Sequence, residues 1–171
     1  MKCLYLAAAI IAQETFESKP NDDKCTVLAL SSGDENSVYQ AGALYGLLQS
    51  QDPSTHQYDF VTGVSGGAVN AVFLARNEKG KEAQAVENML FFWKVLSDHK
   101  MFKGWFGGEA EGLFEKGGLY DPTPLHDFLK DYFTGEDDFD WKRPLNIPLT
   151  HALSGWLADY NESNILRGDV Y

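Results

Sequence analysis

The chain has 171 residues, of which 44% are hydrophobic and 23% charged, and its formal net charge is −11. This composition is that of an ordinary globular domain, and it excludes a disordered or fibrous chain. The acidic excess argues against a nucleic-acid partner, because phosphate contacts need clustered Lys and Arg. It argues equally against simple electrostatic attachment to an anionic membrane.

The first residues have the pattern of a targeting segment. Met1 and Lys2 form a short basic start, Cys3 to Ala12 is an unbroken apolar run, and polar residues follow. An apolar run of this length cannot cross a hydrocarbon core about 30 Å thick. The pattern therefore predicts a signal peptide over residues 1–12, with a short buried strand or helix as the alternative. A signal peptide predicts the secretory pathway, with the protein secreted or held in a vesicular or lysosome-like compartment.

The predicted domain begins near Cys25. Residues 13–24 are polar and contain turn formers, so we expect a flexible lead-in there, and we assign residues 25–171 to the domain. Residues 26–31 form a short apolar run bounded by turn formers, which predicts a buried strand. Apolar residues then recur at helical spacing from Val38 to about residue 50, which predicts an amphipathic helix.

The same alternation follows once more. Residues 58–62 predict a second strand, and a glycine-rich turn leads into a predicted helix over about 66–76. A strand, helix, strand, helix order is typical of parallel α/β architecture. Because such crossovers are right-handed, the loops that follow the two strands should open at the same edge of the sheet.

Two further helices and one strand are predicted downstream. The helices cover about 81–97 and 124–133, and Thr123 is placed as the N-cap of the second, with Pro124 as its first residue. Residues 145–149 predict a third strand, which Pro148 should limit to an edge or an irregular end.

The segment from Met101 to Gly118 is rich in glycine and in aromatic residues, namely Phe102, Trp105, Phe106 and Phe114. One interpretation is a mobile, lipid-facing flap. The other is a loop whose rings pack onto the core, and we favour it because aromatic side chains in loops usually pack.

Gly63-Val64-Ser65-Gly66-Gly67 fits the pattern G-x-S-x-G, which forms a nucleophile elbow when a strand enters it and a helix leaves it. The predicted elements provide this context, and the flanking glycines leave room for a tight turn. The helix start behind Ser65 offers backbone N–H groups to a developing negative charge. The pattern therefore predicts Ser65 as a catalytic nucleophile. A phosphate-binding or purely structural turn is the alternative.

Together, two stretches resemble the patatin-like phospholipase family. Residues 30–44 resemble that family's glycine-rich first loop and the helix after it, and residues 61–71 are similar to its nucleophile elbow. Residues 119–125 resemble a stretch that such proteins carry further on. The resemblance covers about residues 25–165.

This resemblance implies an α/β fold, namely a three-layer α/β/α sandwich with a mainly parallel sheet. It also implies a Ser–Asp dyad that hydrolyses acyl esters of phospholipids or neutral lipids, with no metal or other cofactor. The enzyme would meet its lipid substrate transiently at a membrane or micelle surface. The assignments carried over by resemblance are Ser65 as nucleophile, Gly33, Asp34 and Glu35 in the oxyanion loop, and Gly63, Val64, Gly66 and Gly67 in the elbow.

The chain departs from the family pattern in two places. The family loop G-G-G-x-[KR]-G corresponds to residues 32–37, where only Gly33 is kept and Asp34 brings a carboxylate. A carboxylate about 4 Å from an oxyanion costs about 1 to 4 kcal/mol. The family's aspartate lies in a D-G-[GA] sequence, and none occurs in these 171 residues. We therefore expect a domain truncated at its C-terminus.

Three functions remain open at this point. The first is a serine lipid acyl hydrolase that works through an acyl-Ser65 intermediate. The second is a catalytically inactive patatin-like protein that binds lipid or regulates, which the altered loop and the missing aspartate favour. The third is an α/β-hydrolase esterase with a Ser–Asp–His triad, although the sequence places none of the histidines beside Ser65. These histidines are His56, His99, His126 and His151.

Overall fold

The computed structural model describes residues 25–116, 118–133, 140–151 and 154–161, so the predicted signal peptide and lead-in lie outside the described residues. The chain divides into two compact units. The first unit comprises residues 1–91 and 140–171, and the second comprises residues 92–139. No helix in the described ranges is both long enough and apolar enough to cross a membrane.

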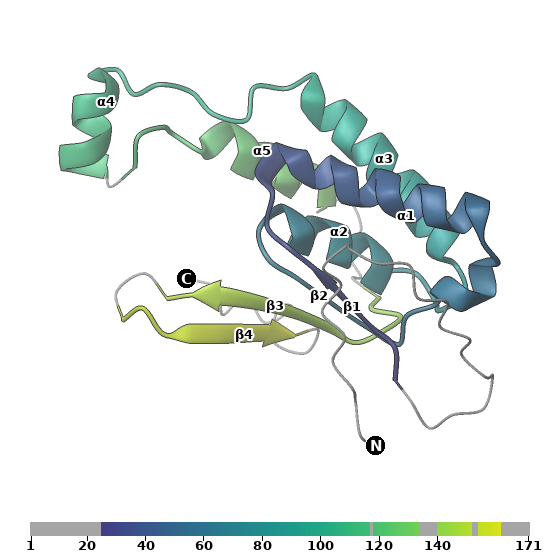
Figure 1. Ribbon diagram of the computed structural model, residues 1–171. Coiled ribbons are helices and arrows are strands. Elements are labelled where there is room, and N and C mark those ends of the chain that lie inside the picture. Colours follow the sequence, from purple (N-terminus) through teal and green to yellow (C-terminus); the bar gives the residue numbers. More distant parts are fainter. Residues whose placement is uncertain (1–24, 117, 134–139, 152–153, 162–171) are drawn as a thin grey trace. The chain divides into compact units, whose positions relative to one another are not determined.

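A four-stranded sheet forms the centre of the first unit (Figure 1). Its strands lie in chain order: β1 (Val27–Leu30), β2 (Phe60–Gly63), β3 (Leu145–Thr150) and β4 (Leu157–Asn161). The first three strands are parallel, and β4 runs antiparallel to β3. The prediction of an α/β fold with a mainly parallel sheet is therefore confirmed.

The helices α1 (Val38–Ser50) and α2 (Gly66–Ala75) lie on the same face of this sheet in Figure 1. Two short 3₁₀ turns, η1 (Asp34–Ser37) and η2 (Pro53–His56), precede α1 and β2. The centre of α2 packs on the sheet, and the fully buried side chains there include Val61, Leu74 and Leu145. Burial of such aliphatic side chains supplies most of the stability of a domain of this kind.

The predicted elements of this unit are confirmed to within about two residues. Of the two alternatives that Pro148 left for β3, an edge strand or an irregular end, the edge strand is wrong. The strand is not at an edge, because it pairs with β2 on one side and β4 on the other. Its pairing with β2 ends at Asn146, so Pro148 lies where β4 is the only neighbour and no ladder bond to β2 is lost. The sequence did not predict β4, whose Asp159 and Asn161 are unfavourable in strands.

The second unit is built around aromatic side chains. The chain enters it through the last part of α3 (Glu82–Ser97), and α4 (Gly108–Glu111), the π-helical turn η3 (Gly112–Lys116) and α5 (Thr123–Phe133) follow. The ring of Phe92 is buried, with its centroid 5.0–5.9 Å from four other ring centroids. These rings belong to Trp93, Phe128, Tyr132 and Phe133.

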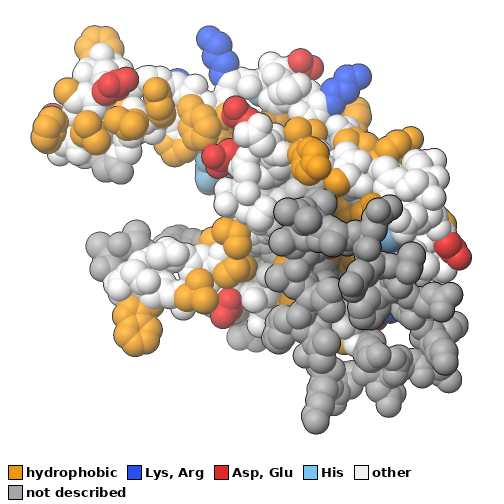
Figure 2. Space-filling view, in the orientation of Figure 1, with side chains coloured by type: hydrophobic (Ala, Val, Ile, Leu, Met, Phe, Trp, Pro, Cys, Tyr) orange, Lys and Arg blue, Asp and Glu red, His pale blue; other side chains and the backbone are white. Residues whose placement is uncertain are grey.

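Two predictions for this unit are wrong. Three of the four aromatic rings in residues 101–118 do not pack, since Phe102, Phe106 and Phe114 are 49%, 108% and 87% exposed. Figure 2 shows apolar side chains gathered at the surface of the α4 segment. Thr123 is not the N-cap but the first residue of α5, and the Asp121 carboxylate accepts hydrogen bonds from its N–H and hydroxyl. Aspartate and threonine are both favourable capping residues, so the sequence alone could not decide between Asp121 and Thr123.

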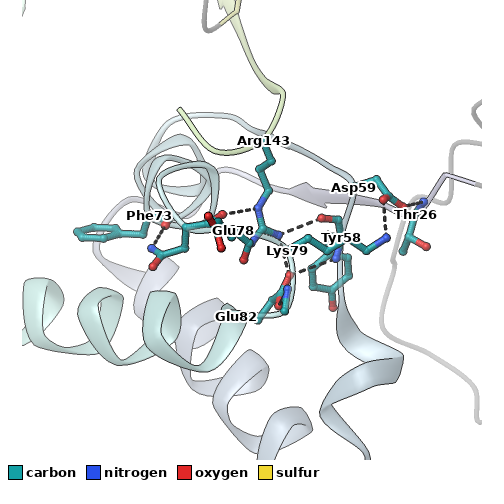
Figure 3. Close-up of polar contacts among 10 residues, drawn as sticks. Thr26, Tyr58, Asp59, Phe73, Glu78, Lys79, Glu82 and Arg143 are labelled. Carbon is teal, nitrogen blue, oxygen red and sulfur yellow. Dashed lines mark hydrogen bonds and ion pairs between the residues drawn. The ribbon is translucent and has the colours of Figure 1, made fainter. Parts of the chain in front are cut away.

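A buried ion pair anchors the chain where it enters β3 (Figure 3). The Arg143 and Glu82 side chains are each 3% exposed and lie 2.7 Å apart. Arg143 also donates to the carbonyl oxygens of Tyr58, Asn77 and Glu78. Burial, together with the nearby Glu82 charge, raises the pKa of the Tyr58 hydroxyl. One guanidinium thus joins the start of β2, the connection after α2 and the approach to β3.

Candidate functional site

The turn between β2 and α2 places Ser65 at the edge of the sheet. β2 ends at Gly63 and α2 begins at Gly66, and the exposed Ser65 lies between them at φ 55° and ψ −126°. A non-glycine residue rarely adopts a positive φ, so the fold holds Ser65 in a strained conformation. This is the strand–turn–helix context that the sequence predicted for the elbow.

The glycines beside Ser65 are required by contact. A Cβ on Gly63 would lie 2.2 Å from the Gly67 carbonyl oxygen, and a Cβ on Gly67 would lie 2.4 Å from the Ser31 carbonyl oxygen. Both distances are far below van der Waals contact, and the opposing atoms belong to the backbone. The close approach of α2 to the end of β2 therefore depends on the absence of a side chain at Gly63, and its approach to the end of β1 depends on the absence of one at Gly67.

The loop after β1 lies against this turn. The Val64 N–H donates to the Leu30 carbonyl oxygen at 3.1 Å. A Cβ on Gly66 would lie 2.6 Å from the Asp34 carbonyl oxygen and 2.3 Å from Ser37 Oγ. The structure thus brings residues 32–37 and the turn of Ser65 together at the carboxyl ends of two parallel strands, where open α/β sheets carry their sites.

Several backbone N–H groups in this region precede the first internal hydrogen bond of the turn or helix that they begin. The first internal bond of η1 runs from the Asn36 N–H to the Gly33 carbonyl oxygen, at 2.8 Å. The amides of Gly33, Asp34 and Glu35 precede that bond, and the Gly66 amide likewise precedes the internal bonds of α2. Amides at such a helix start favour a nearby negative charge.

The substituted positions of the loop have clear structural consequences. Asp34 adopts φ 46°, a conformation that glycine accepts more readily than aspartate. The Ser37 side chain is 1% exposed, and its hydroxyl fills the space beside Gly33 and Gly66. This hydroxyl has no hydrogen-bond partner among the residues that the structure describes.

A buried amide that sequence analysis missed holds the loop in place. Asn70 is fully buried in α2, and its Nδ2 donates to the Ser37 carbonyl oxygen at 2.9 Å and to Gln40 Oε1 at 3.0 Å. Gln40 Nε2 in turn donates to the Ser31 carbonyl oxygen at 2.7 Å. The available signal was a lone asparagine within the apolar residues of α2, because a buried amide side chain needs partners.

Each histidine makes its hydrogen bond within its own part of the chain. His56 is in η2, before β2 begins, and its ring bonds to Gln51 Oε1 at 2.8 Å. His99, His126 and His151 are exposed and have hydrogen-bond partners close in sequence. Within the described ranges, no acidic or basic side chain is hydrogen-bonded to Ser65, and no three His, Cys, Asp or Glu side chains gather as metal ligands would.

Comparison with known protein families gives a match over most of the chain. The sequence model of the patatin-like phospholipase family matches residues 28–162, which is well over half of the chain. No curated protein and no solved structure matches it. The matched range begins at Leu28 in β1 and contains the loop of residues 32–37, the Ser65 turn and the other three strands of the sheet. The chain belongs to the patatin-like phospholipase family.

Proposed function

We propose that this protein is a serine lipid acyl hydrolase and that Ser65 is its nucleophile. The observation that carries the proposal is the position of Ser65, which is exposed and held at positive φ. It lies beside the loop of residues 32–37, whose first backbone amides come before the first internal hydrogen bond of η1. Family membership supplies the substrate class, since this is a lipid hydrolase family. The hydrolysable bond is then the acyl ester of a phospholipid or an acylglycerol.

The reaction has two steps. Ser65 Oγ attacks the ester carbonyl carbon, and its proton passes to a base and then to the leaving alcohol. The carbonyl oxygen becomes an oxyanion, and its proposed donors are the amides of Gly66 and of residues 33–35, which lie together at this end of the sheet. Water then attacks the acyl-Ser65 ester, which releases the fatty acid and restores the hydroxyl.

A second candidate is a patatin-like protein that binds lipid without turning it over. Two observations favour it. Asp34 places a carboxylate in the loop, and no described side chain is hydrogen-bonded to Ser65 as a base would be. A hydroxyl without a base keeps its proton and is a weak nucleophile. The two candidates predict different reactivity of the same side chain.

Covalent labelling with a fluorophosphonate probe separates these candidates. The hydrolase proposal expects labelling of Ser65 in the whole protein, release of fatty acid from phospholipid micelles, and loss of both in Ser65→Ala. Ser50→Ala is the matched control, because Ser50 is an exposed serine at the end of α1. A Ser65 that stays unlabelled while the protein still binds lipid would overturn the hydrolase proposal in favour of the second candidate.

Replacement of Asp34 by glycine tests the role of the loop. The change removes a negative charge and relieves the positive φ of that residue. We expect Asp34→Gly to label about tenfold faster or more, because removal of a carboxylate about 4 Å from the oxyanion is worth about 1 to 4 kcal/mol. An unchanged labelling rate would remove this loop from the proposed oxyanion site.

A further inference from the structure

Hydrogen bonds and close backbone contacts within the segment around α4 fix its conformation. Trp105 Nε1 donates to the Gly118 carbonyl oxygen at 2.9 Å, and the Gly118 N–H donates to the Gly112 carbonyl oxygen at 3.0 Å. Gly112 is buried, and a Cβ there would lie 2.4 Å from the Gly118 carbonyl oxygen. These contacts fix the backbone that carries the neighbouring side chains.

This fixed backbone holds three large apolar side chains in solvent. Phe106 is 108% exposed, Phe114 is 87% exposed and Leu113 is 61% exposed. Figure 2 shows the apolar side chains of the α4 segment at its surface. Single exposed apolar residues are ordinary, but several gathered on one short segment mark an interaction surface.

The chemistry of the surface is specific. Residues between positions 106 and 115 line a shallow concavity of about 540 Å³, and the lining includes Phe106, Phe114, Glu111 and Glu115. No cationic side chain is among the lining residues. Aromatic rings beside carboxylates are the combination that binds a quaternary ammonium group, through the negative face of each ring and the opposite charge.

The charge around the concavity selects among lipid surfaces. Glu109, Glu111 and Glu115 lie in this short segment, and the nearby cation Lys116 is already placed 5.6 Å from the Trp105 ring centroid and 3.8 Å from Glu111. An anionic lipid surface repels such a segment. A choline headgroup instead presents its trimethylammonium group outermost, where it would meet the carboxylates first.

We propose that the surface formed by Phe106, Leu113, Phe114, Glu111 and Glu115 docks onto a choline-headgroup phospholipid surface. The two phenylalanine rings enter the interface, and the carboxylates contact the trimethylammonium groups. This deepens the proposed function, on which it rests for the lipid substrate, by naming the kind of lipid surface that the protein approaches.

Vesicle sedimentation tests the proposal without catalysis, because the protein used is the whole chain carrying Ser65→Ala. We expect binding to phosphatidylcholine vesicles, and weaker binding when phosphatidylserine replaces part of the phosphatidylcholine. Phe106→Ala and Phe114→Ala should each weaken binding about tenfold, since burial of one such ring is worth at least one factor of ten. Both side chains are fully or largely exposed, so the replacements leave the fold intact.

Two further variants sharpen the result. Phe91→Ala removes a ring of α3 that is 61% exposed and lies outside the concavity, and it should leave binding unchanged. Glu115→Gln should weaken binding to phosphatidylcholine and reduce the penalty from phosphatidylserine. Equal binding of the Phe106→Ala, Phe114→Ala and parent proteins, or tighter binding to phosphatidylserine, would overturn the proposal.

The two proposals fail in different ways. Vesicle binding by the Ser65→Ala protein together with an unlabelled Ser65 in the parent would end the hydrolase proposal and leave the docking surface in place. The parent protein could instead release fatty acid while its vesicle binding is insensitive to replacement of Phe106 and Phe114. That result would end the docking proposal and leave the hydrolase proposal in place.

Discussion

At the scale of single residues, the glycine spacing around Ser65 reflects the tight turn between β2 and α2. Gly63, Gly66 and Gly67 each face an atom of the neighbouring loop or helix at a distance that no side chain tolerates. Because the glycines lie within five consecutive residues, the sequence alone suffices to recognise the pattern around Ser65. It does not suffice for the amide network of Asn70 and Gln40, because Asn70 bonds to partners 30 and 33 residues away.

The Gly66 contact leads to a stability prediction. Gly66→Ala places a Cβ against the Asp34 carbonyl oxygen and the Ser37 hydroxyl, so the loop must shift. We expect the free energy of unfolding, measured by urea titration, to fall by about 1 to 3 kcal/mol. Gly42→Ala is the control, because nothing lies within 4 Å of a Cβ at this helical position. There the change should be neutral or stabilising by up to about 1 kcal/mol.

At the scale of elements, sequence periodicity located α1, α2 and α3 because the pattern of each is contained within the helix itself. The position of β3 depends on its pairing with both β2 and β4, and periodicity within a segment does not record which strands pair. The short α4 and η3 depend on glycine contacts within their own segment, such as that of Gly112. Periodicity therefore predicts the longer helices well and the outer part of the sheet poorly.

The start of α5 should respond to acid. Hydrogen bonds from the Thr123 hydroxyl and N–H, aided by Lys103, lower the pKa of Asp121 from 3.8 to about 2. Since the pKa is lower in the folded state, the stabilisation is fully present above about pH 4 and is lost as the pH falls through about 2. Asp121→Asn should therefore lower the Tm near neutral pH, and the difference from the parent should shrink towards pH 2 in thermal unfolding followed by circular dichroism. A difference that stays constant over this range would contradict the assignment. Asp131→Asn, within α5, controls for the loss of a carboxylate at a position that does not cap the helix start.

The link between β3 and the rest of the first unit should depend on its buried ion pair. Arg143→Met leaves Glu82 buried without its cation, so we expect the free energy of unfolding to fall by about 3 to 5 kcal/mol. Lys79→Met breaks the pair with Asp59, which is partly exposed, and should cost less than about 1 kcal/mol. The double variant Glu82→Gln, Arg143→Met should cost less than the sum of its single changes. Strict additivity in urea titrations would show that the two side chains do not act as a pair.

At the scale of the whole molecule, the division into two units predicts two regions of separate stability. The first unit has its own sheet with Val61, Leu74 and Leu145 at the centre, and the second has an aromatic cluster around Phe92. Cooperative units with separate internal contacts unfold locally, each with a different opening free energy. Chain length predicts a single domain, and length does not record how contacts divide within it.

Hydrogen exchange measures this separation. Phe128 contacts Phe92, Tyr132 and His99, so Phe128→Ala should lower the opening free energy of α5 amides by about 1 to 3 kcal/mol, as expected for a half-buried ring. The amides of β1 and β2 should keep their protection. Val61→Ala, a fully buried position in β2, is the reciprocal change, and it should lower protection of β1 and β2 by about 2 kcal/mol while α5 is unaffected. If each replacement lowered protection equally in both regions, the two units would unfold as one, because a shared opening spreads every local loss over the whole structure.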